Sequence, residues 1–336
     1  LGLRVATGAV ALFSIIAVVL AWLALSIQIE RGTLHDLAES RGSALRSLDL
    51  YSKEEGTASF AIDLDVLAPL GNGPGNAATW FADHGRTELA IEHALAGGDV
   101  DGAARLIAGA ALSMHHGGHD DRLQRWFASF DDSAVARHPS LAVVAAWIYA
   151  LNGRPGAADR MADIAERSDQ TGAPEDGASS FRSSKAMLRA FMARGGPTAM
   201  LSDAVIATTE EEPGHPWRMF AFVLLGWAHR LLGDTDAAGT AFIEAVDSAR
   251  VSDVNPFIAL ASRASNAIDL GDWRSAERLT QESHAAFERT NLADIASSLL
   301  VHAVAARVAI HKGDQAQGRA ELVHAQLARA EATYAT

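Results

Sequence analysis

The chain has no cysteine among its 336 residues, which excludes a disulfide framework and any thiolate metal site. Alternation of apolar and polar residues is also scarce, so the sequence offers little support for β-strands. Basic residues are the minority charge, with 28 Lys and Arg against 41 Asp and Glu and a formal net charge of −13. Because nucleic-acid binding requires a basic surface, we expect no direct nucleic-acid binding by this chain.

Patterns typical of catalysis are missing as well. Spacing alone assembles no nucleophile, base and orienting residue. The glycines Gly71, Gly73 and Gly75 lie in APLGNGPGNAAT, but the lysine–hydroxyl pair of a phosphate-binding loop does not follow them. We therefore expect a non-catalytic protein without a cofactor.

A long uncharged stretch runs from Val5 to Ile29 and covers 25 positions. It exceeds the roughly 20 residues that span a bilayer, and it lacks a small-residue cleavage site. We predict a transmembrane helix within residues 1–30; the alternative is a buried helix of a soluble protein. Arginines are denser after the stretch than before it, which favours a cytoplasmic location for the remainder of the chain. We therefore predict that the chain is anchored in a membrane with the remainder in the cytoplasm. If residues 5–29 do not span a membrane, the predicted localisation is cytoplasmic.

Residues 31–76 form the predicted second region. Thr33 to Leu50 has the spacing of a moderately amphipathic helix, and the following residues collect glycine and proline, as linkers do. The third region, residues 77–336, is predicted to consist of helical repeats.

The clearest repeat unit is the stretch from His215 to Arg250. Pro216 suits the first position of a helix, Gly233 suits a turn with positive φ, and Asp234 can cap the helix that follows. Apolar residues follow helical spacing in both halves. They are Trp217, Phe220, Leu224, Trp227 and Leu231 in the first helix, and Ala238, Ala241, Phe242, Ala245, Val246 and Ala249 in the second. Such a hairpin cannot bury its apolar face alone and needs neighbours.

Turn glycines recur with a period of about 40 residues, which is typical of helical-repeat arrays. Gly153, Gly195, Gly233, Gly271 and Gly313 are separated by 42, 38, 38 and 42 positions. We predict an all-α fold, a TPR-like superhelical solenoid preceded by the transmembrane-type helix. Its first helices would line an extended concave surface suited to binding.

The order of the segments resembles a known family. WFADHGRTELAIEHALAGGDVDGAARLI, RLQRWFASF, ARHPSLAVVAAWIYALNGRPGAA and PWRMFAFVLLGWAHRLLGDTDAAGTAF are similar to the helical-repeat region of MalT-like, LuxR-type regulators of the STAND class. The resemblance covers about residues 77–330 and implies a sensor that recognises an inducer or partner and controls self-association. The chain departs from the family because no P-loop precedes the repeats and no C-terminal helix-turn-helix follows them. It is therefore either a fragment or a repeat domain reused on a membrane anchor.

The candidate binding residues are polar or aromatic positions on otherwise apolar first helices. Arginine binds carboxylates and phosphates through two hydrogen bonds, and tryptophan is a frequent interface anchor. The candidates are Trp227, His229, Arg230, Arg263 and Arg307. The alternative for the charged residues is solvation or an ion pair with a neighbouring repeat. The alternative role of Trp227 and Trp147 is core packing, because both lie six residues before a turn glycine. Trp273 follows its turn glycine and is expected to be more exposed.

Two polar clusters are candidate sites by composition. His115, His116 and His119 precede Asp120 and Asp121 and offer metal-ligand chemistry, but glycines place them in a turn, and we interpret them as a solvated loop. The run from Glu210 to Glu212 is likewise interpreted as solvated.

Three functions are therefore open. The leading hypothesis is a sensor array that binds a protein partner or small effector, with possible self-association. The second is a membrane-anchored scaffold for protein assembly. The third, a metal-dependent enzyme built on the histidine cluster, is the least favoured.

Overall fold

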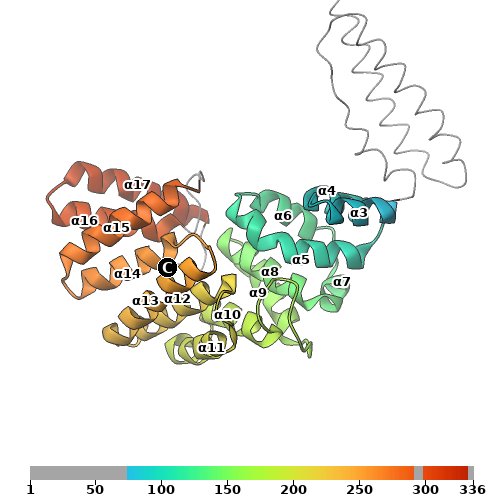
Figure 1. Cartoon of the computed structure of the whole chain (residues 1–336), viewed down its shortest axis with the longest axis horizontal. Coiled ribbons are helices and arrows are strands. Elements are labelled where there is room, and N and C mark those ends of the chain that lie inside the picture. The colour runs from blue at the N-terminus through green and yellow to red at the C-terminus, as the bar shows by residue number, and fades with distance from the viewer. Residues whose placement is uncertain (1–73, 291–297, 332–336) are drawn as a thin grey trace, which may run out of the picture. The chain divides into compact units, whose positions relative to one another are not determined.

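The computed structural model describes residues 74–290 and 298–331, and within them every regular element is a helix (Figure 1). The prediction of an all-α helical-repeat fold is therefore confirmed for this part of the chain. The chain divides into two units between Ala77 and Ala78, and the described residues belong almost entirely to the second.

Five helices precede the regular hairpins. They are α3 (Pro74–Asp83), α4 (Thr87–Ala96), α5 (Val100–His116), α6 (Asp120–Phe127) and α7 (Asp132–Arg137). The turns before α4 and α5 contain Gly85 and Gly98, and both residues have positive φ.

Five helical hairpins follow, each made of two consecutive helices in contact. The first helices are α8 (Pro139–Leu151), α10 (Phe181–Met192), α12 (Pro216–Leu231), α14 (Phe257–Asp269) and α16 (Leu299–His311). The second helices are α9 (Pro155–Glu166), α11 (Gly196–Glu210), α13 (Thr235–Val251), α15 (Trp273–Glu288) and α17 (Gln315–Glu331).

The turn inside most hairpins follows one local rule, in which a glycine with positive φ ends the first helix and an aspartate caps the second. The pair Gly233–Asp234 shows it, because Gly233 has φ +85° and the Asp234 carboxylate accepts the Ala237 N–H at 3.0 Å. Gly271 and Gly313 take the same conformation, and Asp272 and Asp314 make equivalent caps.

The second predicted turn glycine was misplaced by one residue. Gly195 has φ −87°, whereas Gly196 has φ +75°, and Ala193, the residue after α10, lies in the left-handed region. The physical reason is that two adjacent glycines offer two equivalent places for the turn, and local sequence does not distinguish them.

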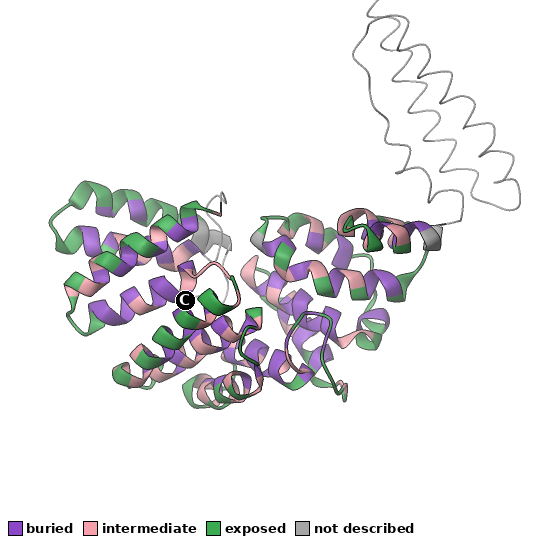
Figure 2. Ribbon diagram, in the orientation of Figure 1, coloured by how far each residue is buried: buried purple, intermediate pink, exposed green. Residues whose placement is uncertain are grey.

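The hairpins stack in order, and consecutive first helices contact each other from α8 to α16. Second helices of neighbouring hairpins have little or no direct contact among the described residues, so the first helices form the continuous layer. Buried residues face neighbouring helices and exposed residues gather at the turns and outer faces (Figure 2).

The hairpin of α12 and α13 tests the apolar pattern directly. All six predicted core positions of α13 are buried, from Ala238 to Ala249. On α12, Trp217 and Leu224 are buried and Phe220 and Trp227 are half-buried, but Leu231 is 58% exposed. Leu231 was therefore wrongly assigned to the core, because it is the last residue of the helix and extends beyond the packed interface.

The predictions for residues 1–30, including the transmembrane helix over residues 5–29, lie outside the described residues. The same holds for the second region up to Pro74, where α3 begins. Among the helices that the structure describes, none has both the length and the apolar character required to cross a bilayer.

Candidate functional site on the first helices

Trp227 joins three helices at the centre of the array. Its indole N–H donates to Ser262 Oγ on α14 at 3.1 Å, and its ring packs edge-on against Phe242 of α13 with centroids 6.0 Å apart. The guanidinium of Arg230 lies over the Trp227 ring at 4.6 Å. Trp227 is half-buried, so its position combines core packing with a surface that a partner can reach.

Two of the predicted arginines are brought together by one carboxylate. Arg230 of α12 donates from Nε to Asp269 Oδ2 at 2.7 Å, and Arg307 of α16 lies 3.3 Å from Asp269 Oδ1. Asp269 is the last residue of α14, so this row ties three successive first helices together. Because these side chains are partly exposed to solvent, which screens their charges, each ion pair contributes about 1 kcal/mol. Arg230 and Arg307 therefore form ion pairs with a neighbouring repeat, which was the alternative to a binding role.

Arg263 differs from the other two arginines. It is half-buried on α14, where ten of the 13 residues are buried, and no described residue forms an ion pair or hydrogen bond with its guanidinium. His229, by contrast, lies 3.8 Å from the Asp234 carboxylate at the turn. Among the predicted arginines, Arg263 is therefore the one without an ionic partner in the described part of the chain.

Other aromatic residues of the first helices pack between repeats. Trp147 of α8 lies 4.3 Å from Phe191 of α10 and 5.9 Å from Trp217 of α12, measured between ring centroids. Trp273 stacks on His311 at 3.5 Å and is half-buried. These contacts favour a structural role for Trp147, as its repeated position suggested.

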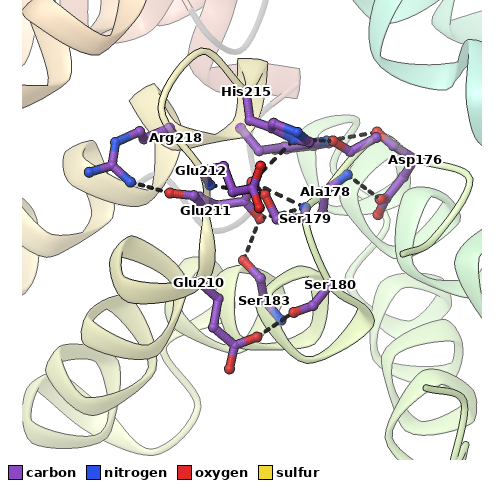
Figure 3. Close-up of polar contacts among 12 residues, drawn as sticks. Asp176, Ala178, Ser179, Ser180, Ser183, Glu210, Glu211, Glu212, His215 and Arg218 are labelled. Carbon is purple, nitrogen blue, oxygen red and sulfur yellow. Dashed lines mark hydrogen bonds and ion pairs between the residues drawn. The ribbon is translucent and has the colours of Figure 1, made fainter. Parts of the chain in front are cut away.

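The acidic run from Glu210 to Glu212 contains one buried residue, which the sequence analysis did not predict. Glu211 is fully buried, and its carboxylate accepts the Ser179 N–H at 3.2 Å, the Ser179 hydroxyl at 3.0 Å and the Ser183 hydroxyl at 2.5 Å (Figure 3). The interpretation of a solvated run was therefore wrong for Glu211, although Glu212 is exposed. Glu211 follows α11 directly and lies beside the loop before α10, where Ser179 supplies an N–H and a hydroxyl. Sequence spacing cannot reveal this contact between residues 32 positions apart.

A second buried carboxylate lies beside Glu211. Asp176 accepts the Ala178 N–H at 3.0 Å and the hydroxyl of Ser184, and its backbone carbonyl accepts the Trp217 indole N–H at 2.7 Å (Figure 3). Burial raises the pKa of Asp176 to about 6, and the nearby Glu211 carboxylate adds to the rise. This buried acid network holds the loop before α10 against α12, and its role is structural.

The raised pKa of Asp176 predicts a pH dependence of stability. The folded chain holds this proton more tightly than the unfolded chain, so the stabilisation is complete below about pH 4 and is lost as the pH rises through 6. The full change is roughly 3 kcal/mol in the free energy of unfolding. Asp176→Asn removes the titrating group, and its amide can still accept from Ala178 and donate to Ser184.

Urea unfolding of both chains at several pH values between 4 and 7 measures this effect. Subtracting one profile from the other removes the contributions of the titrating groups that the two chains share. We expect the variant to gain stability relative to the unaltered chain as the pH rises. Parallel profiles would show that Asp176 titrates alike in the folded and unfolded states.

Part of the histidine cluster that we interpreted as a solvated loop is buried. His115 is buried, its Nδ1 lies 2.9 Å from Asp120 Oδ1, and Asn152 donates to the same carboxylate at 2.7 Å. His119 is exposed. The solvated interpretation was wrong for His115, because the last turn of α5 faces α8 and buries this side chain against the first hairpin.

A cluster with metal-ligand chemistry lies elsewhere, in residues that the sequence analysis passed over. His284, His302 and Glu321 lie on α15, α16 and α17, with candidate ligand atoms within 4.8 Å of one another. Their separations of 18 and 19 positions match no metal motif. The available signal was His302 itself, a polar residue inside the apolar run LLVHAVAARV.

Comparison with known proteins adds little to this geometry. No protein-family model matches the chain, and no curated protein matches it. A solved structure titled "Functional Characterization of Pseudomonas Aeruginosa pilF" is similar, with 15% sequence identity, coverage of 69% of this chain and 93% of that chain, and a TM-score of 0.41. This similarity is too low to support an argument, so the evidence for a helical array is the arrangement of the chain's own helices. The link to MalT-like regulators remains a prediction.

Proposed function

We propose that the chain is a non-catalytic binding array whose first helices recognise a protein partner. The observation that carries the proposal is Arg263, a half-buried arginine without a partner among the described residues, on a first helix in which ten of the 13 residues are buried. An unpaired guanidinium in a partly desolvated position favours a carboxylate from another molecule. Ser262, its neighbour in the sequence, anchors Trp227.

The composition of this region suits protein recognition. Arg and Trp are enriched among the residues that dominate interface energies, and half-buried side chains are already partly ordered before a partner binds. Phe220, Phe222 and Trp227 of α12 remain half-buried against the core. We therefore propose a partner segment with an acidic residue for Arg263 and apolar side chains for the neighbouring aromatic residues.

Site-specific photo-crosslinking in the full chain tests this proposal. A photoreactive amino acid at position 263 should crosslink one defined protein, whereas the same residue at position 274, exposed on second helix α15, should not. With that partner purified, Arg263→Ala should weaken its binding at least about tenfold. Equal crosslinking at both positions, or unchanged affinity of the variant, would contradict the proposal.

The finer hypotheses concern what the binding controls. The resemblance of residues 77–330 to MalT-like regulators supports a sensor that changes its self-association when an effector binds. Sedimentation of the full chain with candidate effectors tests it, and an unchanged oligomeric state with every effector would argue against it.

Membrane anchoring is the alternative setting for the same array. It is supported by the uncharged stretch of residues 5–29, and it places the repeats on the cytoplasmic side. Fractionation of cells that express the chain with and without residues 5–29 tests it, because only the complete chain should sediment with membranes.

A further inference from the structure

Three side chains from three successive helices converge inside the last two hairpins. His284 lies on α15, His302 on α16 and Glu321 on α17, and these helices pack in that order. His302 is 5% exposed, Glu321 is 6% exposed and His284 is half-buried. A buried carboxylate faced by two imidazoles is costly to assemble unless the groups share a proton or a cation.

The distances fit a shared cation. His302 Nδ1 lies 2.9 Å from Glu321 Oε2, and His284 Nε2 lies 3.9 Å from Glu321 Oε1, too far for a hydrogen bond. Ligand atoms around a tetrahedral zinc ion, each about 2.0–2.2 Å from the metal, are about 3.4 Å apart. The two separations end on different oxygens of Glu321 and lie on either side of that value, and one ligand atom from each residue lies within 4.8 Å of the other two. Small side-chain rotations would therefore bring the two imidazole nitrogens and the carboxylate around one ion.

The surroundings orient two of the three groups. His284 directs Nε2 toward Glu321 while its Nδ1 lies 3.4 Å from Glu288 Oε1, and Gln317 donates to Glu321 Oε1 at 2.7 Å. A carboxylate behind the non-ligating nitrogen of a histidine is the usual outer contact of a metal-bound imidazole. A simple His302–Glu321 hydrogen bond would not require this orientation of His284.

We propose that His284 Nε2, His302 Nδ1 and the Glu321 carboxylate bind one divalent transition-metal ion of the zinc class. Two imidazoles and one carboxylate are ligands that zinc favours, and three protein ligands leave one tetrahedral position for water or a partner side chain. The ion links the hairpin of α14 and α15 to the hairpin of α16 and α17.

Zinc titration of the full chain tests the proposal. After removal of bound metal with a chelator, isothermal titration with zinc chloride should show one saturable site with a 1:1 ratio. Zinc should also raise the midpoint of thermal unfolding, because a ligand of the folded state stabilises it. His284→Gln and Glu321→Gln should each weaken zinc binding at least about tenfold.

The matched control is His311→Gln, which removes an exposed histidine from α16 and should leave the affinity unchanged. His284 is the decisive position, because it lies outside the His302–Glu321 hydrogen bond. Its replacement should leave the circular dichroism spectrum unchanged while the site is lost. Absence of saturable binding, or equal affinity in His284→Gln and the unaltered chain, would overturn the proposal.

Cobalt(II) gives a measurement that needs no variant. Bound in place of zinc in the unaltered chain, it should produce the intense visible absorption of tetrahedral coordination. A spectrum of weak octahedral bands alone would count against a buried three-ligand site.

Discussion

Glu211→Ala should lower the free energy of unfolding by about 4 kcal/mol, because three donors, two on half-buried Ser179 and one on buried Ser183, lose their acceptor together. The N–H and hydroxyl of Ser179 and the hydroxyl of Ser183 all donate to this carboxylate. An alanine side chain supplies no acceptor and leaves a space too enclosed for full solvation. Removal of the negative charge also lowers the pKa of Asp176, because the Glu211 carboxylate is one of the groups that raise it.

The matched control is Glu212→Ala, the adjacent and exposed glutamate, which should change stability by about 0.5 kcal/mol or less. Urea unfolding followed by circular dichroism measures both variants. Similar stabilities of the two variants would mean that water replaces the Glu211 carboxylate at little cost, and the buried network would then lose its assigned role.

Phe242→Ala should cost about 3–5 kcal/mol, because this ring is fully buried where α12 and α13 cross. Its neighbour across the crossing is Gly226. A Cβ atom built on Gly226 would lie 2.6 Å from Phe242 Cδ1 and 2.8 Å from Phe242 Cζ. Gly226→Ala should therefore also destabilise the chain, by about 1–3 kcal/mol.

The two changes are expected to interact, and the sign of that interaction is the test. In the Phe242→Ala background the ring is absent, so Gly226→Ala should become stabilising by up to about 1 kcal/mol through its helix propensity. Gly156→Ala in α9 is the control, because its Cβ would meet nothing within 4 Å and should stabilise either background. A double-mutant cycle by thermal or urea unfolding measures the coupling, and additive effects would contradict a direct contact between residues 226 and 242.

The helical pattern was readable because its causes are local. Gly233 ends α12 since a residue without a side chain takes positive φ freely, and Asp234 caps α13 with its own neighbours. The core face of α13 follows from helical spacing alone. The Gly195–Gly196 pair shows the limit of such reasoning, because either glycine satisfies the local requirement.

The candidate site was readable only in part. The sequence located Trp227, Arg230, Arg263 and Arg307 on first helices. It could not show that Asp269 pairs with Arg230 and Arg307, while Arg263 has no partner among the residues that the structure describes. Pairing depends on distances between repeats about 40 positions apart. An arginine at such a position forms an intramolecular ion pair if packing places a carboxylate beside it. Without such a neighbour, it is available to bind another molecule.

By itself the sequence determined that the chain forms helical hairpins in series, because glycine conformation, aspartate capping and apolar spacing act within a few residues. Only the tertiary structure decided the fate of its polar groups: Glu211 and His115 became buried hydrogen-bonding residues, and His284, His302 and Glu321 converged. The physical reason is that the cost or use of a polar side chain depends on the neighbours that surround it in space, and those neighbours come from other helices.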